Sequence, residues 1–400
     1  MKYLTYDYDY SKSLLDNILI SRGVEDIDKF LDLDCEEENP LRYSNMQLAC
    51  GILYNHIQNN SSIAFLVDTD LDGYTSSSIL IQYLQYRYPD LQIHIIHQQA
   101  NKAHGLNDYV LSQIDLLKPN LLIAPDSSSS DFKYHKKLIE RGVTLLILDH
   151  HEFLEEETDK NTNKGIIVVN NHGKNSVNKY ISAVGVVYLF IKLYNKTIFK
   201  DDLEDTYLDV VALGLISDSC NMRDIYTRKL TIQGIDNIHN LFIKALLKQQ
   251  KDKVKSLNIM AIAFYISPLV NACIRISSLE DRQAVFRALT FGEEVEEAVS
   301  ICVKAKGQQD KIRDKEFRAL QKQIDDGKLN EDGAIILVKD DITPAIIGLV
   351  ANKISDKHKK PTVVLRNIND TYFGSIRNSI EAFDFKSWLN NTGVINWCRG

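Results

Sequence analysis

Three aspartates occupy alternate positions directly after an apolar run. Residues 63–67 are Ile-Ala-Phe-Leu-Val, and Asp68, Asp70 and Asp72 follow, with Gly73 behind them. An apolar run of this length is typical of a buried strand, which would place the carboxylates together at the edge of a sheet. Carboxylates at such spacing repel one another unless a positive charge neutralises them, and a divalent metal ion does this best. The pattern therefore predicts a metal site.

Two other kinds of site begin with a similar pattern. A calcium-binding loop of the helix–loop–helix type also starts D-x-D-x-D-G, but it follows a helix and needs a glutamate at its twelfth position, where this chain has Ile79. A phosphatase with an aspartate nucleophile has D-x-D-G-T after a strand, whereas Tyr74 separates Gly73 from Thr75 here. The first alternative is disfavoured, and the second is weakened but stays open.

Acidic or imidazole side chains also come directly after two further predicted strands and one predicted helix. Because ligands of open α/β sheets bind beyond the carboxyl ends of the strands, we expect these side chains at one edge. Carboxylates with one or two imidazoles and no thiolate favour Mn²⁺, or Mg²⁺ with less selectivity. Two ions that share a bridging aspartate would activate a water and stabilise the leaving oxygen of a phosphoester. The residues are Asp126 after the run 121–124, Asp149, His150 and His151 after the run 143–148, and Asp218 after the apolar helix 208–217.

The elements that must position these residues indicate an α/β fold. From residue 62 to about 215, apolar runs alternate with helical segments, which is typical of a parallel sheet covered on both faces. One connecting helix is predicted over 76–88, beginning with Ser and Thr caps. The predicted strands of this segment are 63–67, 91–96, 121–124, 143–148 and 166–169. A second α/β segment is predicted to have strands 334–338 and 362–365 around a helix 345–354. Residues 11–60 and 225–330 are predicted to be mostly helical, with one long charged helix over 297–326.

Length and composition set further bounds. A chain of 400 residues exceeds one ordinary core, and 44% hydrophobic with 25% charged residues is typical of a soluble protein. We expect no stretch long and charge-free enough to span a bilayer, and no signal peptide at the N-terminus. Six cysteines without C-x-x-C spacing indicate neither a disulfide framework nor a zinc site, so we expect a reduced, cytoplasmic protein. A net charge of −7 argues against coating nucleic acid by bulk electrostatics, but not against an enzyme with carboxylates around metals.

Several of these motifs resemble those of the DHH phosphoesterases. The pattern D-x-D-x-D-G-x-T-S at 68–76, together with Asp126 and the Asp-His-His of 149–151, is similar to motifs of that family. Further segments resemble its RecJ branch, the single-strand-specific exonucleases, in the expected order along nearly the whole chain. These segments are 21–31, 45–46, 211–218, 267–275, 347–351 and 374–379.

The resemblance implies a domain order and roles for individual residues. We expect an N-terminal helical lead-in over 1–60, a DHH catalytic domain over 61–235, a helical connector over 236–333 and a smaller α/β DHH-associated domain over 334–400. The implied metal ligands are Asp68, Asp70, Asp72, Asp126, His150 and Asp218. The implied catalytic residues are His151, Asp149 and Asp126, with His151 at the scissile phosphate. The residues that would hold phosphates of the strand across an interdomain cleft are Asn271, Arg275, Ser375 and Arg377. Arginine offers a planar fork suited to phosphate oxygens, although outside these motifs each arginine would be interpreted as a surface ion pair.

The function implied is a 5′ to 3′ exonuclease on single-stranded DNA that uses Mn²⁺ or Mg²⁺, with two ions in the site. A single-strand-binding protein or a replication or repair protein is the expected partner, and no membrane is expected. The alternatives are an enzyme for short oligoribonucleotides or cyclic dinucleotides, and an inactive scaffold, although inactive relatives lose the acids. Two departures from the family pattern stand out: Ser127 to Ser130 replace a turn that usually contains glycine, and the chain stops at Gly400, where the family continues. We therefore expect either a minimal form or a longer natural protein.

Overall fold

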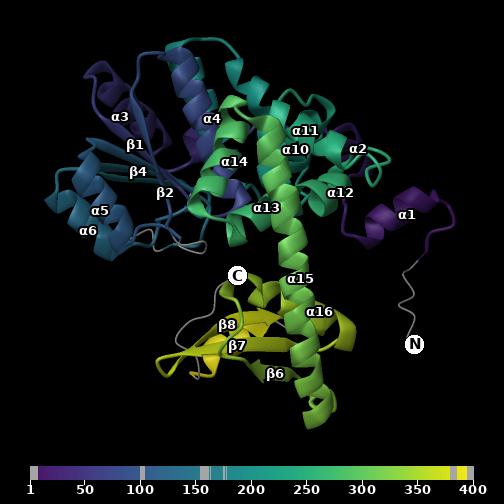
Figure 1. The fold of residues 1–400 in the computed structure, drawn as a ribbon. Coiled ribbons are helices and arrows are strands. Elements are labelled where there is room, and N and C mark those ends of the chain that lie inside the picture. Colours follow the sequence, from purple (N-terminus) through teal and green to yellow (C-terminus); the bar gives the residue numbers. More distant parts are fainter. Residues whose placement is uncertain are drawn as a thin grey trace. The chain divides into compact units, whose positions relative to one another are not determined.

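The computed structural model in Figure 1 describes residues 8–99, 104–153, 162, 164–173, 176, 178–378 and 385–393. The chain divides into two compact units, Met1–Cys302 and Val303–Gly400. The division falls inside helix α15 (Val295–Gly327), within the predicted helical connector. Each unit has a sheet and a core of its own, and each is described separately below.

The first unit contains a five-stranded sheet with the order β2-β1-β3-β4-β5, and all its neighbouring strands are parallel. This confirms the predicted fold class. β1, β3 and β5 are buried along their whole length, as expected for strands covered on both faces. The strands are β1 (Ile63–Val67), β2 (Ile93–His97), β3 (Leu121–Pro125), β4 (Thr144–Asp149) and β5 (Ile166–Asn170).

Helices cover both faces of this sheet (Figure 1). α5 (Asp108–Leu117) and α6 (Phe132–Glu140) pack on the face to which Ala64 and Leu66 point. α4 (Leu71–Arg87) and α8 (Ala183–Ile198) pack against β1, β3 and β4 on the other face and against each other. Both faces of each central strand are thus removed from water, which is why these strands consist of continuous apolar residues.

The start of α4 differs from the prediction. The helix begins at Leu71 rather than at residue 76, with Asp70 as its N-cap residue: Gly73 N donates to Asp70 Oδ1 at 2.9 Å. The hydroxyls expected to cap it are buried inside the helix, where Ser76 donates to the carbonyl of Asp72 at 2.5 Å. A buried serine satisfies its hydroxyl on the preceding turn, so the Ser/Thr run continues the helix instead of starting it. Because a strand precedes this helix, the site is not a helix–loop–helix calcium loop.

The order of the strands places a topological switch point beside the acids that follow β1. From β1 the chain crosses to β2 on one side, whereas β3, β4 and β5 follow on the other side. A reversal of this kind is a topological switch point, where loops from neighbouring strands separate and leave room for a ligand. The acids after β1 and the acid after β3 lie at this switch point.

The remainder of the first unit is helical, as predicted. α3 packs against α8 and β5, and α9 packs against α4, α8 and α10. The elements are α1 (Leu14–Ser21), α2 (Ile27–Asp32), η1 (Pro40–Arg42), α3 (Met46–Gln58), η2 (Leu203–Tyr207), α9 (Leu208–Ser217), α10 (Ile225–Asp236), α11 (Leu241–Gln249), α12 (Ile259–Ala261), the π-helical turn η3 (Ile262–Ile266), α13 (Ser267–Ile276) and α14 (Leu279–Phe291).

One expectation from the sequence was wrong. α12, η3 and α13 form a continuous helical stretch, Ile259–Ile276, with a mean hydropathy of 1.7, which by length and composition alone is apolar enough to cross a membrane. Pro268 lies in the first turn of α13, directly after the π-helical turn η3. Half of the stretch is buried inside the protein, including Ile262, Ile266 and Val270.

The second unit has a three-stranded sheet with the order β6-β7-β8. β6 (Ile335–Val338) and β7 (Thr362–Ile368) are parallel, and β8 (Thr371–Arg377) is antiparallel to β7. Strand β8 was not predicted; it follows a two-residue turn in which Asn369 and Asp370 both have positive φ, 49° and 59°, as in a type I′ hairpin. α16 (Ile347–His358) covers one face, and the remaining elements are η4 (Pro344–Ile346) and α17 (Phe385–Asn391).

Candidate metal centre

The predicted acidic and imidazole residues of the first unit gather at the carboxyl edge of the sheet. Their oxygen and nitrogen atoms form overlapping groups in which all the offered atoms lie within 4.8 Å of one another. Such a concentration of oxygen and imidazole donors, without thiolates, suits Mn²⁺ or Mg²⁺. The groups are Asp126 with His150 and His151, Asp72 with His150 and Asp218, and Asp68 with Asp70 and Asp126.

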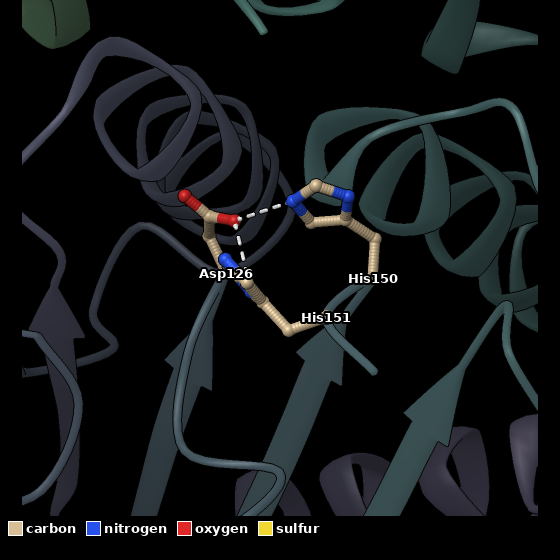
Figure 2. A group of neighbouring side chains, drawn as sticks. All are labelled: Asp126, His150 and His151. Atoms are coloured by element: carbon tan, nitrogen blue, oxygen red, sulfur yellow. Dashed lines mark ion pairs between the residues drawn. The ribbon is translucent and has the colours of Figure 1, made fainter. Parts of the chain in front are cut away.

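Asp126 belongs to two of these three groups, and Figure 2 shows its carboxylate facing His150 and His151. Its Oδ1 is 3.2 Å from His150 Nε2 and 3.9 Å from His151 Nδ1. The carboxylate is buried, and neither oxygen accepts a hydrogen bond from any residue that the structure describes. Burial, followed by the charges of Asp70 and Asp72, raises the pKa of Asp126 well above its ordinary value. A buried carboxylate without donors needs a cation, so this residue fits a metal ligand.

The backbone after Asp126 is strained. Asp126 has φ 61° and Ser128 has φ 78°, a left-handed conformation that favours glycine over other residues. His135 Nε2 lies 2.8 Å from the carbonyl oxygen of Ser128, and Ser129 N donates to Asp149 Oδ2 at 3.4 Å. The serine run thus makes the tight turn for which a glycine was expected, with α6 and β4 holding the turn in place. Strain of this kind is typical of residues whose position matters for function.

Asp149 holds His151 in a fixed orientation. Its Oδ1 lies 2.8 Å from His151 Nδ1 and also accepts hydrogen bonds from the backbone N–H of His150 and of His151. Burial raises the pKa of Asp149, but the hydrogen bond from His151 and the charges of both histidines outweigh it and hold the pKa below its ordinary value. Asp149 therefore supports the site as a charged orienting group.

His150 is in the opposite situation. Burial, together with the positive charge of His151, lowers the pKa of His150 to about 4, so the ring is neutral near pH 7. Its Nε2 lies 3.8 Å from Asp72 Oδ2, in addition to its approach to Asp126, and its Nδ1 lies 3.8 Å from Asp218 Oδ2. Metals bind the neutral form of imidazole, so the protonation state fits a ligand role.

The N-terminus of α8 holds Asp72, which the sequence did not indicate. Ser182 Oγ donates to Asp72 Oδ1 at 2.9 Å, and the backbone N–H groups of Ala183 and Val184 donate to the same carboxylate at 2.8 and 3.3 Å. A helix N-terminus stabilises an anion in this position. Ser182 directly before an apolar run was a signal for a helix start, but not for its partner.

Asp218 is the least buried acid of the cluster, with a side chain 35% exposed, and it ends α9. Burial, followed by the charge of Asp70, raises the pKa of Asp218 to about 7. The carboxylates of the cluster thus oppose one another's ionisation, as expected of ligands arranged for cations.

A histidine that the sequence analysis missed also lies in the site. His104 Nδ1 is 2.8 Å from Asp68 Oδ2, and Gly105 N donates to Asp68 Oδ1 at 3.1 Å. Burial lowers the pKa of His104, but the charge of Asp68 and the hydrogen bond to it outweigh burial and raise the pKa to about 9. No pattern pointed to this residue, because it lies in a connection between β2 and α5 rather than at a strand end.

The predicted phosphate-binding residues are divided between the two units. Asn271 and Arg275 lie on α13, which packs against α4 and α9, the helices that carry Asp72 and end at Asp218. Asn271 Oδ1 is buried without a hydrogen-bond partner, and Arg275 forms no ion pair with any described residue. The surface ion pair considered for Arg275 is therefore not formed within the described part of the chain.

Ser375 and Arg377 lie on β8 of the second unit, on the face toward α16. A Cβ atom at Gly348 would lie 2.8 Å from Arg377 Nη2 and 3.4 Å from Ser375 Oγ, so both side chains pass over this glycine. Ser379, the last residue of the motif that contains them, lies outside the described residues.

The sequence of this chain is similar to known proteins of the DHH family. Residues 62–215 match the N-terminal domain of the DHH family. A Bacillus subtilis protein named as an SPbeta prophage-derived single-strand DNA-specific exonuclease, YorK, is 31% identical over 98% of this chain and 71% of its own length. The chain belongs to the DHH family. Its resemblance to the RecJ branch is confirmed as well: the single-stranded-DNA-specific exonuclease RecJ of Bacillus subtilis is 24% identical over 88% of this chain and 44% of its own length.

Solved RecJ structures share the DHH fold seen here. Exonuclease RecJ bound to manganese has a TM-score of 0.67 at 20% identity and covers 80% of each chain. RecJ of Thermus thermophilus in complex with Mn²⁺ has a TM-score of 0.70 at 20% identity, covering 87% of this chain and 49% of that one. These proteins hold manganese, and the DHH chain described here offers an oxygen and imidazole donor set of the kind that binds it.

Proposed function

We propose that this DHH protein is a metal-dependent exonuclease that hydrolyses single-stranded DNA from its 5′ end. The observation that carries the proposal is Asp126, a buried carboxylate without a hydrogen-bond donor, surrounded by further acids and a neutral imidazole at the switch point of the sheet. Relatives named single-strand DNA-specific exonucleases, matched over nearly the whole chain, support the choice of substrate.

Five side chains would hold two divalent cations. The bound ions would supply an activated water and would neutralise charge on the phosphate as the ester bond breaks. The cluster suits this task because the fold brings its donor atoms within 4.8 Å of one another in each group. The five residues are Asp70, Asp72, Asp126, His150 and Asp218.

His151 would contact the scissile phosphate. Asp149 occupies its Nδ1 at 2.8 Å, so its Nε2 is the nitrogen available to an oxygen of the substrate. The carboxylate beside it favours the protonated ring, and accordingly its pKa is raised despite burial. A protonated imidazole donates a hydrogen bond through each nitrogen and stabilises the negative charge that develops during hydrolysis.

The strand would be held by few contacts. The chain carries a net charge of −7, so affinity for a polyanion has to come from local cationic groups rather than from the whole surface. Arg275 on α13 and Arg377 on β8 would supply two of these contacts, and Asn271 and Ser375 would add hydrogen bonds to phosphate oxygens. Arginine binds phosphate in a bidentate manner that fixes the position of the strand as well as its charge.

Digestion of end-labelled strands tests the proposal. Single-stranded DNA, single-stranded RNA and duplex DNA, each labelled at the 5′ or at the 3′ end, are incubated with and without Mn²⁺. The expected result is rapid release of labelled mononucleotide from the 5′ end of single-stranded DNA, only with metal. Preferred hydrolysis of RNA or of dinucleotides would indicate the oligonucleotide-degrading alternative instead, and release of the 3′ label first would contradict the direction proposed.

A further inference from the structure

A second carboxylate–imidazole pair faces the Asp149–His151 pair. Asp68 Oδ2 lies 2.8 Å from His104 Nδ1, the same distance as that between Asp149 Oδ1 and His151 Nδ1. The two imidazole rings are themselves in contact, with centroids 4.8 Å apart in an edge-to-face arrangement. The site therefore contains two imidazoles, each held by a carboxylate through Nδ1, and no described residue forms a hydrogen bond with either Nε2.

The residues that follow His104 in the connection between β2 and α5 are held by hydrogen bonds. Gln98 Nε2 donates to the carbonyl oxygen of Gly105 at 2.6 Å, and Leu106 N donates to Asp131 Oδ2 at 2.7 Å. Gly105 has φ 62°, and a Cβ atom there would lie 2.3 Å from Asp131 Oδ2, so only glycine fits this close approach. These contacts tie the position of His104 to both β2 and α6.

The partners of Asp68 distinguish it from Asp126. Both oxygens of Asp68 accept a hydrogen bond, one with His104 and one from the backbone of Gly105, whereas neither oxygen of Asp126 does so within the described residues. The short contact between Asp68 Oδ2 and His104 Nδ1 suits Asp68 to orient His104, as Asp149 orients His151.

Resting on the function proposed above, we propose that His104 is a second phosphate-binding imidazole, whose Nδ1 is fixed by Asp68 and whose Nε2 binds a nonbridging oxygen of the phosphate at the metal site. The side chain of His104 is 48% exposed, so a ligand can reach it. Two rings in contact can each donate a hydrogen bond to a different oxygen of one phosphate group. These two bonds would fix the rotation of the phosphate relative to the attacking water. His104 is then a specificity and positioning contact that the DHH motif does not contain.

Three substitutions of His104 separate this role from that of a simple support for Asp68. In His104→Asn the amide nitrogen takes the place of Nδ1 and keeps the hydrogen bond to Asp68, but the substitution removes Nε2. In His104→Gln the amide nitrogen lies near the position of Nε2, and His104→Ala removes both. The matched control is His239→Asn, because His239 is an exposed imidazole outside the site. Thermal unfolding of all variants checks that the fold is kept.

Two readouts are measured on the full chain loaded with Mn²⁺: the affinity for inorganic phosphate by calorimetry, and kcat on a 5′-phosphorylated single strand. We expect His104→Ala and His104→Asn to weaken phosphate binding at least about tenfold and to lower kcat about 100-fold. His104→Gln should recover part of both, and the affinity for Mn²⁺ should stay within about threefold of that of the parent protein.

Two results would overturn the role of His104, and a third would separate it from the proposed exonuclease function. If His104→Asn matches the parent protein in both readouts, Nε2 has no role and the inference is overturned. A loss of Mn²⁺ affinity larger than the loss of phosphate affinity would also overturn it, because His104 would then be a metal ligand. If the parent protein cuts no single-stranded DNA but its phosphate affinity still depends on His104, the proposed exonuclease function fails while this inference stands.

Discussion

The two compact units present their functional candidates in opposite ways. In the first unit, Asp68, Asp72, Asp126 and Asp149 are at most 2% exposed and come from strand ends and helix starts of a rigid core. In the second unit, Arg377 is exposed on β8, a strand of a hairpin. Buried charges of one sign are costly without a cation, whereas the charge of an exposed arginine stays hydrated and costs little. Chemistry and strand affinity should therefore be separable by mutation.

The largest effect is expected for Asp126→Asn. The amide has almost the same shape but no charge, so the variant should lose about 1,000-fold or more of the hydrolysis rate while single-strand binding survives. The metal-free variant should unfold at the same or a higher temperature than the parent protein, because a buried unpaired charge is removed. Conversely, Mn²⁺ should raise the unfolding temperature of the parent protein much more than that of the variant.

Asp108→Asn is the control for this experiment, since Asp108 is an exposed acid at the start of α5 that pairs with Lys137. It should leave hydrolysis and the Mn²⁺ response unchanged. Full activity of Asp126→Asn would show that the buried cluster is not the site of hydrolysis and would remove the contrast between the two units.

An intermediate effect, on affinity rather than on chemistry, is expected for Arg275→Ala and Arg377→Ala. Each should weaken single-strand binding about tenfold and reduce the slope of log affinity against log salt by about 0.7, the amount expected for one phosphate contact. Fluorescence anisotropy over a salt series measures both quantities. Arg318→Ala, at an exposed arginine of α15, is the control; a salt slope unchanged in both test variants would exclude these phosphate contacts.

A smaller effect concerns stability at acidic pH. Burial, followed by the charge of Arg282, lowers the pKa of His97 to about 4, and its ring packs edge-on against Tyr74 and Phe286. The unfolded chain takes up a proton near pH 6.5 while the folded protein does not, so the stability is complete above pH 6.5 and is lost as the pH falls toward 4. His97→Phe keeps the aromatic contacts and should make the loss of unfolding free energy between pH 7.5 and 5 smaller by about 2 kcal/mol. Urea unfolding at the two pH values measures it, and identical losses in parent and variant would contradict the shifted pKa.

The smallest effect is expected in the turn that positions Asp126. Because Ser128 has φ 78°, Ser128→Gly should be tolerated or should raise the unfolding free energy by up to about 1 kcal/mol. Ser128→Val, with a branched Cβ, should lower it by about 1 to 2 kcal/mol and reduce activity by displacing the carboxylate. Chemical denaturation with parallel activity assays tests the pair, and equal behaviour of the two variants would show that the strain has no consequence.

The strands of the first unit and the sheet edge that carries the candidate metal centre could be predicted from the sequence. All five of its strands were predicted with ends within about two residues, because each is a short, largely apolar run between polar connections. The edge at which Asp126 and the Asp-His-His segment meet also followed, since parallel strands bring their carboxyl ends to one side. By contrast, β8 was missed because its turn is Asn-Asp and its residues are mostly exposed, so no apolar run marked it.

The sequence by itself determined the donor types and the sheet that gathers them, because both depend on local patterns that repeat at fixed spacing. Only the tertiary structure decided which partner each donor has: α8 for Asp72, His104 for Asp68, and none among the described residues for Asp126. These partners lie 30 to more than 100 residues apart along the chain, as in the separation of 111 between Ala183 and Asp72 and of 36 between His104 and Asp68. Hydrogen bonds act over a few ångströms, so a pairing between such distant residues leaves no periodic trace in the sequence.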